Sequence, residues 1–183
     1  MAKRLDDLFM TEEEYLSFEG KSDQQHEYVA GRVFLMTGGT AAHSEITANL
    51  SECLRRIAKK LGCHVYSHNL KVKVATSFYY PDVIYTCEPY QPDALWVTAP
   101  ILIVEVLSPS TQSTDRREKL FAYREIPSLM QYLIVSQKER KIELYCKDQG
   151  SWRQSVFVDS DALSLESIPV VLKLDDIYDG TGL

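Results

Sequence analysis

The chain of 183 residues contains 45% hydrophobic and 25% charged residues, enough for one substantial core and too short to need two. Its formal net charge of -6 excludes attraction of the whole molecule to a polyphosphate, so nucleic acid could be contacted only through a local basic surface or a bound metal ion. No apolar run approaches the roughly 20 residues of a membrane-spanning helix, and the start, MAKRLDDLFM, does not resemble a signal peptide. We expect a single domain, residues 1–183, in a soluble cytoplasmic protein without membrane contact.

The cysteines are expected to be reduced. Cys53, Cys63, Cys87 and Cys146 are scattered, without the density of a disulfide scaffold. Three of them lie in apolar surroundings, where cysteine serves as a small hydrophobic residue. The sequence therefore predicts structural thiols.

The N-terminal part predicts a short helix and a hairpin. Thr11 and Glu14 have the spacing of a capping box, so a helix is expected to begin there and to end near Gly20. Residues 1–20 would then be an N-terminal helical appendage. The following segment, HEYVAGRVFLM, predicts two short strands that meet at its central Ala-Gly pair.

A long helix is predicted from about residue 42 to the stop at Gly62. Its apolar positions recur at helical spacing: Ile46, Leu50, Cys53, Leu54, Ile57 and Leu61. Beyond it, HVYSHNLKVKV alternates with period two, and YPDVIYT predicts a strand that begins after a proline. The nearly continuous apolar run ILIVEVL predicts a central strand buried on both faces.

The second half predicts a strand–helix–strand crossover. A polar linker, SPSTQST, leads into the helix DRREKLFAYREI, which Pro127 ends, and the strand MQYLIVS follows. Two alternating stretches, KIELYCK and WRQSVFV, would extend the sheet in antiparallel fashion, and SIPVVLKLDDIY would complete the fold. This order indicates an α/β fold in which helices flank a mixed sheet.

Glu105 is the most informative single residue, because it interrupts the apolar central strand. An unpaired buried charge costs several kcal/mol, so Glu105 must meet a cation, a metal ion or a proton. The structural alternative is a glutamate at the strand end that pairs with a surface arginine.

Asp82 follows Pro81 directly and stands at the start of a strand. Alone it is typical of a turn residue. Together with Glu105, however, it would supply two carboxylates from the ends of neighbouring strands, which are the hard oxygen ligands that Mg²⁺ or Mn²⁺ requires. Water and a substrate phosphate would complete the octahedron.

The helix after the central strand offers a cation. Asp115, Lys119 and Tyr123 are spaced four apart and share one helix face, so Lys119 could point back at the strand end. The alternative is an ion pair of Lys119 with Asp115 within the helix. Two further residues could face the same cleft: Glu27 at the first hairpin, and His43 at the entry of the long helix. Each also has a structural interpretation, since His43 could simply cap or pack near the helix start.

The ordered series of these motifs resembles a known family. YYPDVIY with Asp82, ILIVEVLSPST with Glu105, DRREKLFAY and MQYLIV are similar to a bacterial family described as putative restriction endonucleases, a branch of the PD-(D/E)XK nuclease superfamily. HEYVAGRVFLM and TAAH extend the resemblance over nearly the whole chain. One position departs from the superfamily pattern, because the lysine expected two residues after the glutamate is Leu107 here, and the family supplies the cation from the following helix, where Lys119 stands.

The resemblance implies a restriction-endonuclease-like core and hydrolysis of nucleic-acid phosphodiester bonds, with DNA as the expected substrate. It implies metal binding by Asp82 and Glu105, with Mg²⁺ or Mn²⁺ as the cofactor, and catalytic roles for Lys119 and Glu27. A homodimer is expected from use, since cutting both strands of a duplex favours a two-fold pair. Two rival hypotheses are a catalytically silent module that binds nucleic acid or protein, and a metal-dependent hydrolase of a small phosphate.

Overall fold

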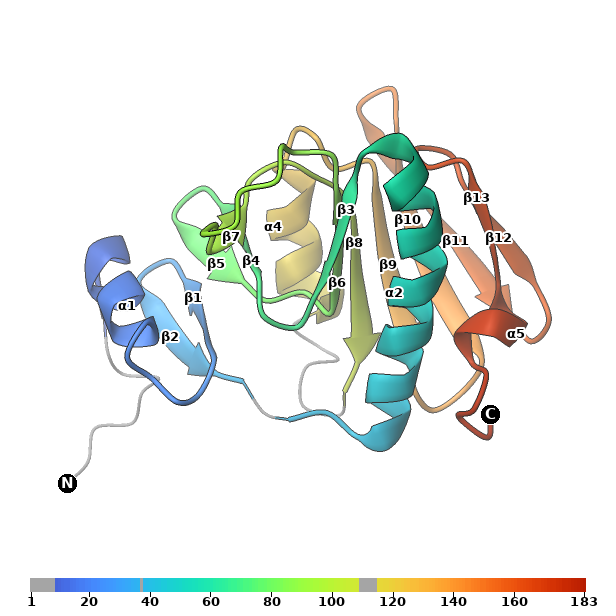
Figure 1. Ribbon diagram of the computed structural model, residues 1–183, viewed down its shortest axis with the longest axis horizontal. Helices are drawn as coiled ribbons and strands as arrows, with labels where there is room; N and C mark the ends of the chain where they lie inside the picture. The colour runs from blue at the N-terminus through green and yellow to red at the C-terminus, as the bar shows by residue number, and fades with distance from the viewer. Residues whose placement is uncertain (1–8, 37, 109–114) are drawn as a thin grey trace.

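The computed structural model describes residues 9–36, 38–108 and 115–183. Within them the chain forms two larger β-sheets, one two-stranded sheet and a small number of helices (Figure 1). The expected α/β architecture, a mixed sheet flanked by helices, is confirmed. The predicted linker spans residues 108–114, and all of it except Ser108 lies outside the described residues.

The main sheet has six strands, and β8, the strand that carries Glu105, lies inside it. Its order is β11 (Ser151–Val158), β10 (Lys141–Asp148), β9 (Gln131–Ser136), β8 (Pro100–Leu107), β6 (Val83–Thr86) and β3 (His64–Ser67). β8 and β9 run parallel, as the predicted crossover requires, and the other neighbours are antiparallel. β8 is thus a central strand, as predicted from its apolar run.

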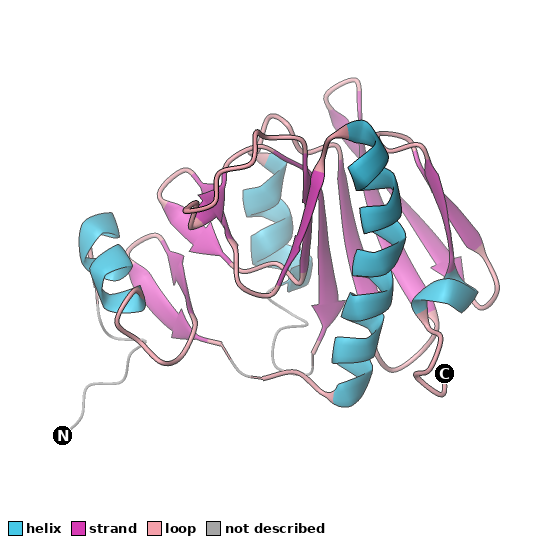
Figure 2. Cartoon of the chain, in the orientation of Figure 1, coloured by secondary structure: helices cyan, strands magenta, loops and turns pink. Residues whose placement is uncertain are grey.

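Helices cover both faces of this sheet (Figures 1 and 2). α2 (Ala41–Leu61) packs on the face to which Leu102, Val104 and Val106 contribute. The opposite face, with Ile103 and Leu107, is covered by the segment after β8, which begins with one π-helical turn, η2 (Asp115–Lys119), and continues as α4 (Leu120–Arg124). Because side chains alternate along a strand, Glu105 belongs to the α4 face.

The N-terminal part joins the second sheet. α1 (Glu12–Glu19) begins at the predicted capping box, and the predicted hairpin forms β1 (His26–Val29) and β2 (Arg32–Leu35). The sheet order is β2, β1, β5 (Ser77–Tyr79), β4 (Lys71–Val74) and β7 (Trp96–Val97). The fully buried ring of Tyr15 in α1 stacks on Tyr28, with ring centroids 4.8 Å apart.

The alternating stretch from His64 to Val74 is divided between the two sheets. β3 belongs to the main sheet and β4 to the second, and between them His68 adopts a left-handed backbone conformation with φ of +68°. Periodicity could not reveal this division, because period-two alternation is the same in either sheet. At the C-terminal end, β12 (Ala162–Leu165) and β13 (Val170–Lys173) form a separate hairpin that α5 (Leu174–Ile177) follows.

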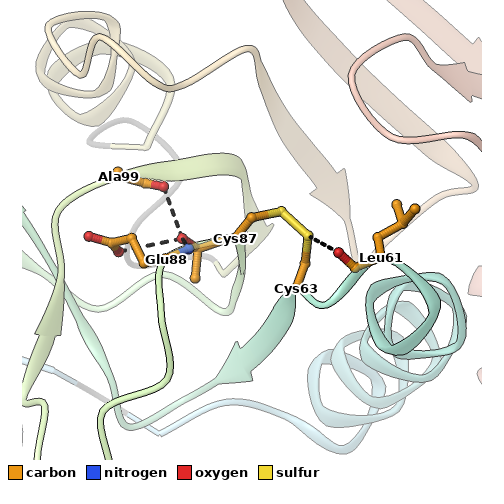
Figure 3. Close-up of a disulfide and its surroundings, with 6 residues drawn as sticks. Leu61, Cys63, Cys87, Glu88 and Ala99 are labelled. Atoms are coloured by element: carbon orange, nitrogen blue, oxygen red, sulfur yellow. Dashed lines mark hydrogen bonds between the residues drawn. A yellow bond between two sulfur atoms is a disulfide. The ribbon is translucent and has the colours of Figure 1, made fainter.

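One prediction about the cysteines is wrong. Cys63 and Cys87 form a disulfide (Figure 3). Cys53 and Cys146 are free. In the pairing of β3 with β6, His64 faces Thr86. Cys63 precedes His64 and Cys87 follows Thr86, so the two cysteines lie opposite each other at the end of this strand pair. A contact made by strand pairing leaves no mark in the local sequence, and the scattered spacing therefore misled the prediction. No helix in the described part of the chain is long and apolar enough to cross a membrane.

Candidate active site

The ends of β6 and β8 meet at a cavity of about 320 Å³. In their antiparallel register Val83 faces Val104, so the next residues, Asp82 and Glu105, reach the same end of the strand pair. Both carboxylates line the cavity, together with Lys119 and His43. The structure therefore gathers there the predicted metal ligands, the predicted cation and a histidine.

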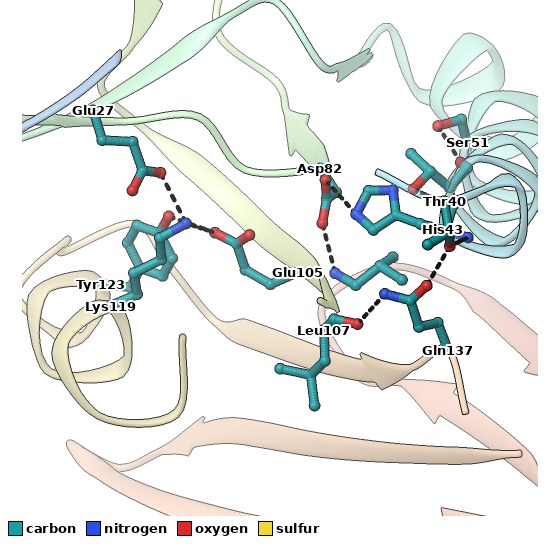
Figure 4. A network of polar contacts seen from close by, with 12 residues as sticks. Glu27, Thr40, His43, Ser51, Asp82, Glu105, Leu107, Lys119, Tyr123 and Gln137 are labelled. Atoms are coloured by element: carbon teal, nitrogen blue, oxygen red, sulfur yellow. Dashed lines mark hydrogen bonds and ion pairs between the residues drawn. The ribbon is translucent and has the colours of Figure 1, made fainter. Parts of the chain in front are cut away.

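Lys119 is held between two carboxylates (Figure 4). Its Nζ atom lies 3.1 Å from Oε1 of Glu105 and 2.8 Å from Oε1 of Glu27. Lys119 and Glu105 are each only 3% exposed, so these two charges are largely shielded from bulk water. The predicted approach of Lys119 to the end of the central strand is confirmed, and Glu27 belongs to the same cluster. The side chain of Asp115, the alternative partner of Lys119, lies outside the described part of the chain.

Tyr123 completes the environment of Glu105. Its hydroxyl donates a hydrogen bond to Oε1 of Glu105 at 2.8 Å, the same oxygen that Lys119 contacts. Burial raises the pKa of Tyr123 well above its ordinary value, and the negative charge of Glu105 raises it further. Tyr123 therefore keeps its proton and, as a hydrogen-bond donor, orients the carboxylate of Glu105.

The switch from π-helix to α-helix occurs at this cluster. η2 ends at Lys119 and α4 begins at Leu120, so Lys119, which contacts Glu105, is the last residue of the wider turn. Such π-turns occur often at functional sites, where they change the direction of side chains. Lys119 and Tyr123 nevertheless share the face that their spacing predicts.

Asp82 is bound to both β8 and α2. Its Oδ2 atom accepts a hydrogen bond from the backbone N–H of Val106 at 2.6 Å, and its Oδ1 atom lies 3.2 Å from Nε2 of His43. His43 stands in the first turn of α2, where Thr40 is the N-cap and accepts from the His43 N–H. Gly39 leaves room for the imidazole ring, since a Cβ atom there would lie 2.8 Å from Nδ1 of His43.

A glutamine outside the predicted set connects these elements. The side chain of Gln137 donates to the carbonyl of Leu107 at 2.6 Å and accepts from the hydroxyl of Thr40 (Figure 4). It therefore links the end of β8 to the N-terminus of α2. No motif in the sequence indicates Gln137. For His43 the sequence left two interpretations, a capping role and a role in the cleft, and the structure places its side chain in the cleft.

The two carboxylates fit a hydrated divalent ion. Mg²⁺ is commonly held by one or two carboxylates while water and substrate phosphate fill the other positions. Among the residues that the structure describes, no three His, Cys, Asp or Glu side chains come together to hold a metal ion. The donor set of Asp82 and Glu105 thus suits an ion whose other positions are filled by water and a substrate phosphate.

These features define a restriction-endonuclease-like protein: a mixed sheet, a helix on each of its faces, and carboxylates and a lysine at the end of β8. The chain belongs to the Uma2 family, described as "Putative restriction endonuclease", whose model matches residues 12–175. It is 37% identical over 175 residues to the uncharacterized protein slr1290 of Synechocystis sp. (strain ATCC 27184 / PCC 6803 / Kazusa), which covers 93% of this chain and 92% of the relative. The uncharacterized protein sll1609 of the same organism is 33% identical over 143 residues, covering 75% of this chain and 81% of the relative.

A solved structure shares the fold. It is that of a putative nuclease belonging to DUF820 from Anabaena variabilis ATCC 29413, with a TM-score of 0.78 and 16% sequence identity. The match covers 94% of this chain and 99% of the other. At this identity the likeness establishes the nuclease-type fold, while the substrate and the cofactor have to be argued from the site.

Proposed function

We propose that this protein is a metal-dependent endonuclease that hydrolyses phosphodiester bonds of nucleic acid, with DNA as the substrate. The observation that carries the proposal is the contact between Lys119 and Glu105 at the end of β8. Lys119 supplies from a helix the cation that the strand lacks, because position 107 is a leucine. Asp82 lines the same cavity, so carboxylates and a buried cation are available to one phosphate group.

Each side chain has a definite task in this mechanism. Asp82 and Glu105 would hold Mg²⁺ or Mn²⁺, which when bound lowers the pKa of water and offsets developing charge on the phosphate. Lys119 would orient the attacking water or stabilise the developing negative charge. Glu27 keeps the ammonium group of Lys119 in place, and Tyr123 fixes the orientation of Glu105.

The test is cleavage of single- and double-stranded DNA by purified protein in Mg²⁺ and in Mn²⁺. Asp82→Asn, Glu105→Gln and Lys119→Met should each lose at least about 100-fold in rate, because each removes several kcal/mol of transition-state stabilisation. Glu125→Gln is the matched control, since it neutralises an exposed glutamate near the end of α4 and should keep the wild-type rate. The variants must first be shown to be folded by circular dichroism.

A wild type that cleaves no nucleic acid with any divalent metal would refute the proposal. The fold would then be better explained as a binding module, the reading that the acidic net charge of -6 favours. Turnover of a small phosphodiester without any polynucleotide being cut would instead favour a small-phosphate hydrolase.

Assembly and location belong to the same proposal. A homodimer would let two sites act on the two strands of a duplex, and light scattering in solution tests it. The cytoplasmic location stays a prediction, and the Cys63–Cys87 disulfide bears against it, because disulfides are more common in oxidising compartments.

A further inference from the structure

The cavity beside the carboxylates has a second, uncharged group of lining residues. They come from the segment before β1, the residue after β2 and the turn between β3 and β4: Gln24, Gln25, Met36 and His68. Amides, a thioether and an imidazole suit an uncharged polar and planar group better than a phosphate. The proposed catalytic residues account for the charged lining and leave this uncharged lining without a role.

Gln25 is locked in one orientation. Its Nε2 atom donates to the backbone carbonyl of His68 at 3.2 Å and to Oδ1 of Asn69 at 3.1 Å. A backbone carbonyl can only accept, so the amide nitrogen must be the atom on that side. Because an amide has two N–H groups and both are used, Gln25 can offer a ligand only its acceptor, Oε1.

The turn that holds Gln25 is tight. His68 has a left-handed backbone with φ of +68°, which few residues other than glycine adopt. Ala30, Ala75, Gln149 and Asp159 share this conformation, each at a turn, so the φ of His68 marks a tight turn. Here the bond from Gln25 to the carbonyl of His68 is one of the interactions that fix the turn.

We propose that this lining is a nucleobase subsite, which accepts one base of the substrate while the phosphate lies at the carboxylates. The inference rests on the proposed function and adds base selectivity to it. A cavity of about 320 Å³ is at the lower end of the range of roughly 300–1,000 Å³ for ligand pockets, which suits one nucleotide unit and not a stacked duplex.

The locked amide selects between bases. Adenine and cytosine carry an amino group, a donor, at the position where guanine and thymine carry a carbonyl, an acceptor. Oε1 of Gln25 accepts from the amino group, whereas a carbonyl would face it acceptor to acceptor. The subsite should therefore favour adenine and cytosine by about five- to tenfold, the value of one neutral hydrogen bond.

The experiment compares nucleotides that differ in this one group. Isotope-labelled wild-type protein is titrated with dAMP against dIMP, and with dCMP against dUMP, in the presence of Mg²⁺, and the Kd values are determined by NMR. The amino members should bind about five- to tenfold more tightly, and the side-chain amide signal of Gln25 should shift. Gln25→Met should abolish the difference within each pair.

Asn69 provides a matched pair of variants, because it is exposed and does not line the cavity. Asn69→Asp keeps the acceptor for Nε2 of Gln25 and should keep the preference. Asn69→Ala removes one of the two acceptors that hold the amide of Gln25. The amide can then turn and donate its free N–H to a carbonyl, so the preference should fall below about twofold. A merely structural role of Asn69 would change both pairs of Kd values equally and leave their ratio unaltered.

The outcomes separate this inference from the nuclease proposal. Equal binding within both pairs, or a preference that survives Gln25→Met, overturns the base subsite even if the wild type cleaves DNA. Selective binding that depends on Gln25, without cleavage of any polynucleotide, upholds the subsite and overturns the nuclease. Absence of any nucleotide binding overturns the subsite.

Discussion

The ion cluster at Lys119 allows a quantitative test of the site through stability. Glu27 and Glu105 both contact the same ammonium group, so their carboxylate oxygens lie within about 6 Å of each other. Two unit charges at that distance repel by about 3 kcal/mol at an effective dielectric constant of 20. Lys119→Met removes the cation and leaves the two carboxylates facing each other, so the free energy of unfolding at pH 7 should fall by about 3 kcal/mol.

Urea denaturation measures the loss, and a second substitution identifies its cause. Adding Glu27→Gln to Lys119→Met removes one of the two charges and should recover most of the lost stability. Lys138→Met, at an exposed lysine, should change the free energy of unfolding by less than about 0.5 kcal/mol. Acid should also restore the stability of Lys119→Met. Its folded state binds a proton more readily than its unfolded state, so the free energy of unfolding rises as the pH falls.

Two results would refute this reasoning. A loss below about 1 kcal/mol would mean that Lys119 is not a buried cation between two charged groups. An equal loss with and without Glu27→Gln would mean that lost packing of the lysine chain, and not the unpaired carboxylates, is the cause.

Three further predictions concern groups away from the carboxylates. Burial lowers the pKa of Lys71, so the folded protein binds fewer protons than the unfolded chain and its stability should rise toward pH 10.5. Urea unfolding at pH 7 and about 9.5 should show this rise in the wild type and not in Lys71→Met. Burial raises the pKa of Tyr178 to about 12, so its contribution to the free energy of unfolding should be lost between pH 10 and 12 in the wild type and not in Tyr178→Phe. Tyr178→Phe also leaves the Lys141 N–H unpaired, which should lower the free energy of unfolding at pH 7 by about 1–3 kcal/mol, as thermal unfolding measures. Reducing the Cys63–Cys87 disulfide, which spans 24 residues, should lower stability by about 3.5 kcal/mol, and dithiothreitol should leave a Cys63→Ser/Cys87→Ser variant unchanged.

The elements that the sequence predicted well are those governed by local chemistry. The capping box of α1, the hairpin of β1 and β2, and the length of α2 follow from caps, turns and helical spacing. Glu105 was found because a charge in an apolar strand demands a partner, and Lys119 because four-residue spacing sets a helix face.

The contacts that the sequence could not predict join residues far apart in the chain. His43 and Asp82 meet because α2 and β6 pack together, and Gln137 reaches Thr40 from the end of β9. Neither pair has a spacing rule that would bring it to attention. The same holds for Cys63 and Cys87, which depend on the register of β3 and β6.

The position of the lysine follows from how the α4 face of the sheet is covered. Residues 105 and 107 of β8 point to the same face, so a cation for Glu105 could come either from position 107 or from the helix above it. In this chain Leu107 is buried beneath that helix, in the cluster that includes Leu120 and Ile103. An apolar residue at 107 anchors the segment, and the anchored segment in turn directs Lys119 at Glu105. In this chain the strand position therefore serves packing, and the helix supplies the cation that Glu105 requires.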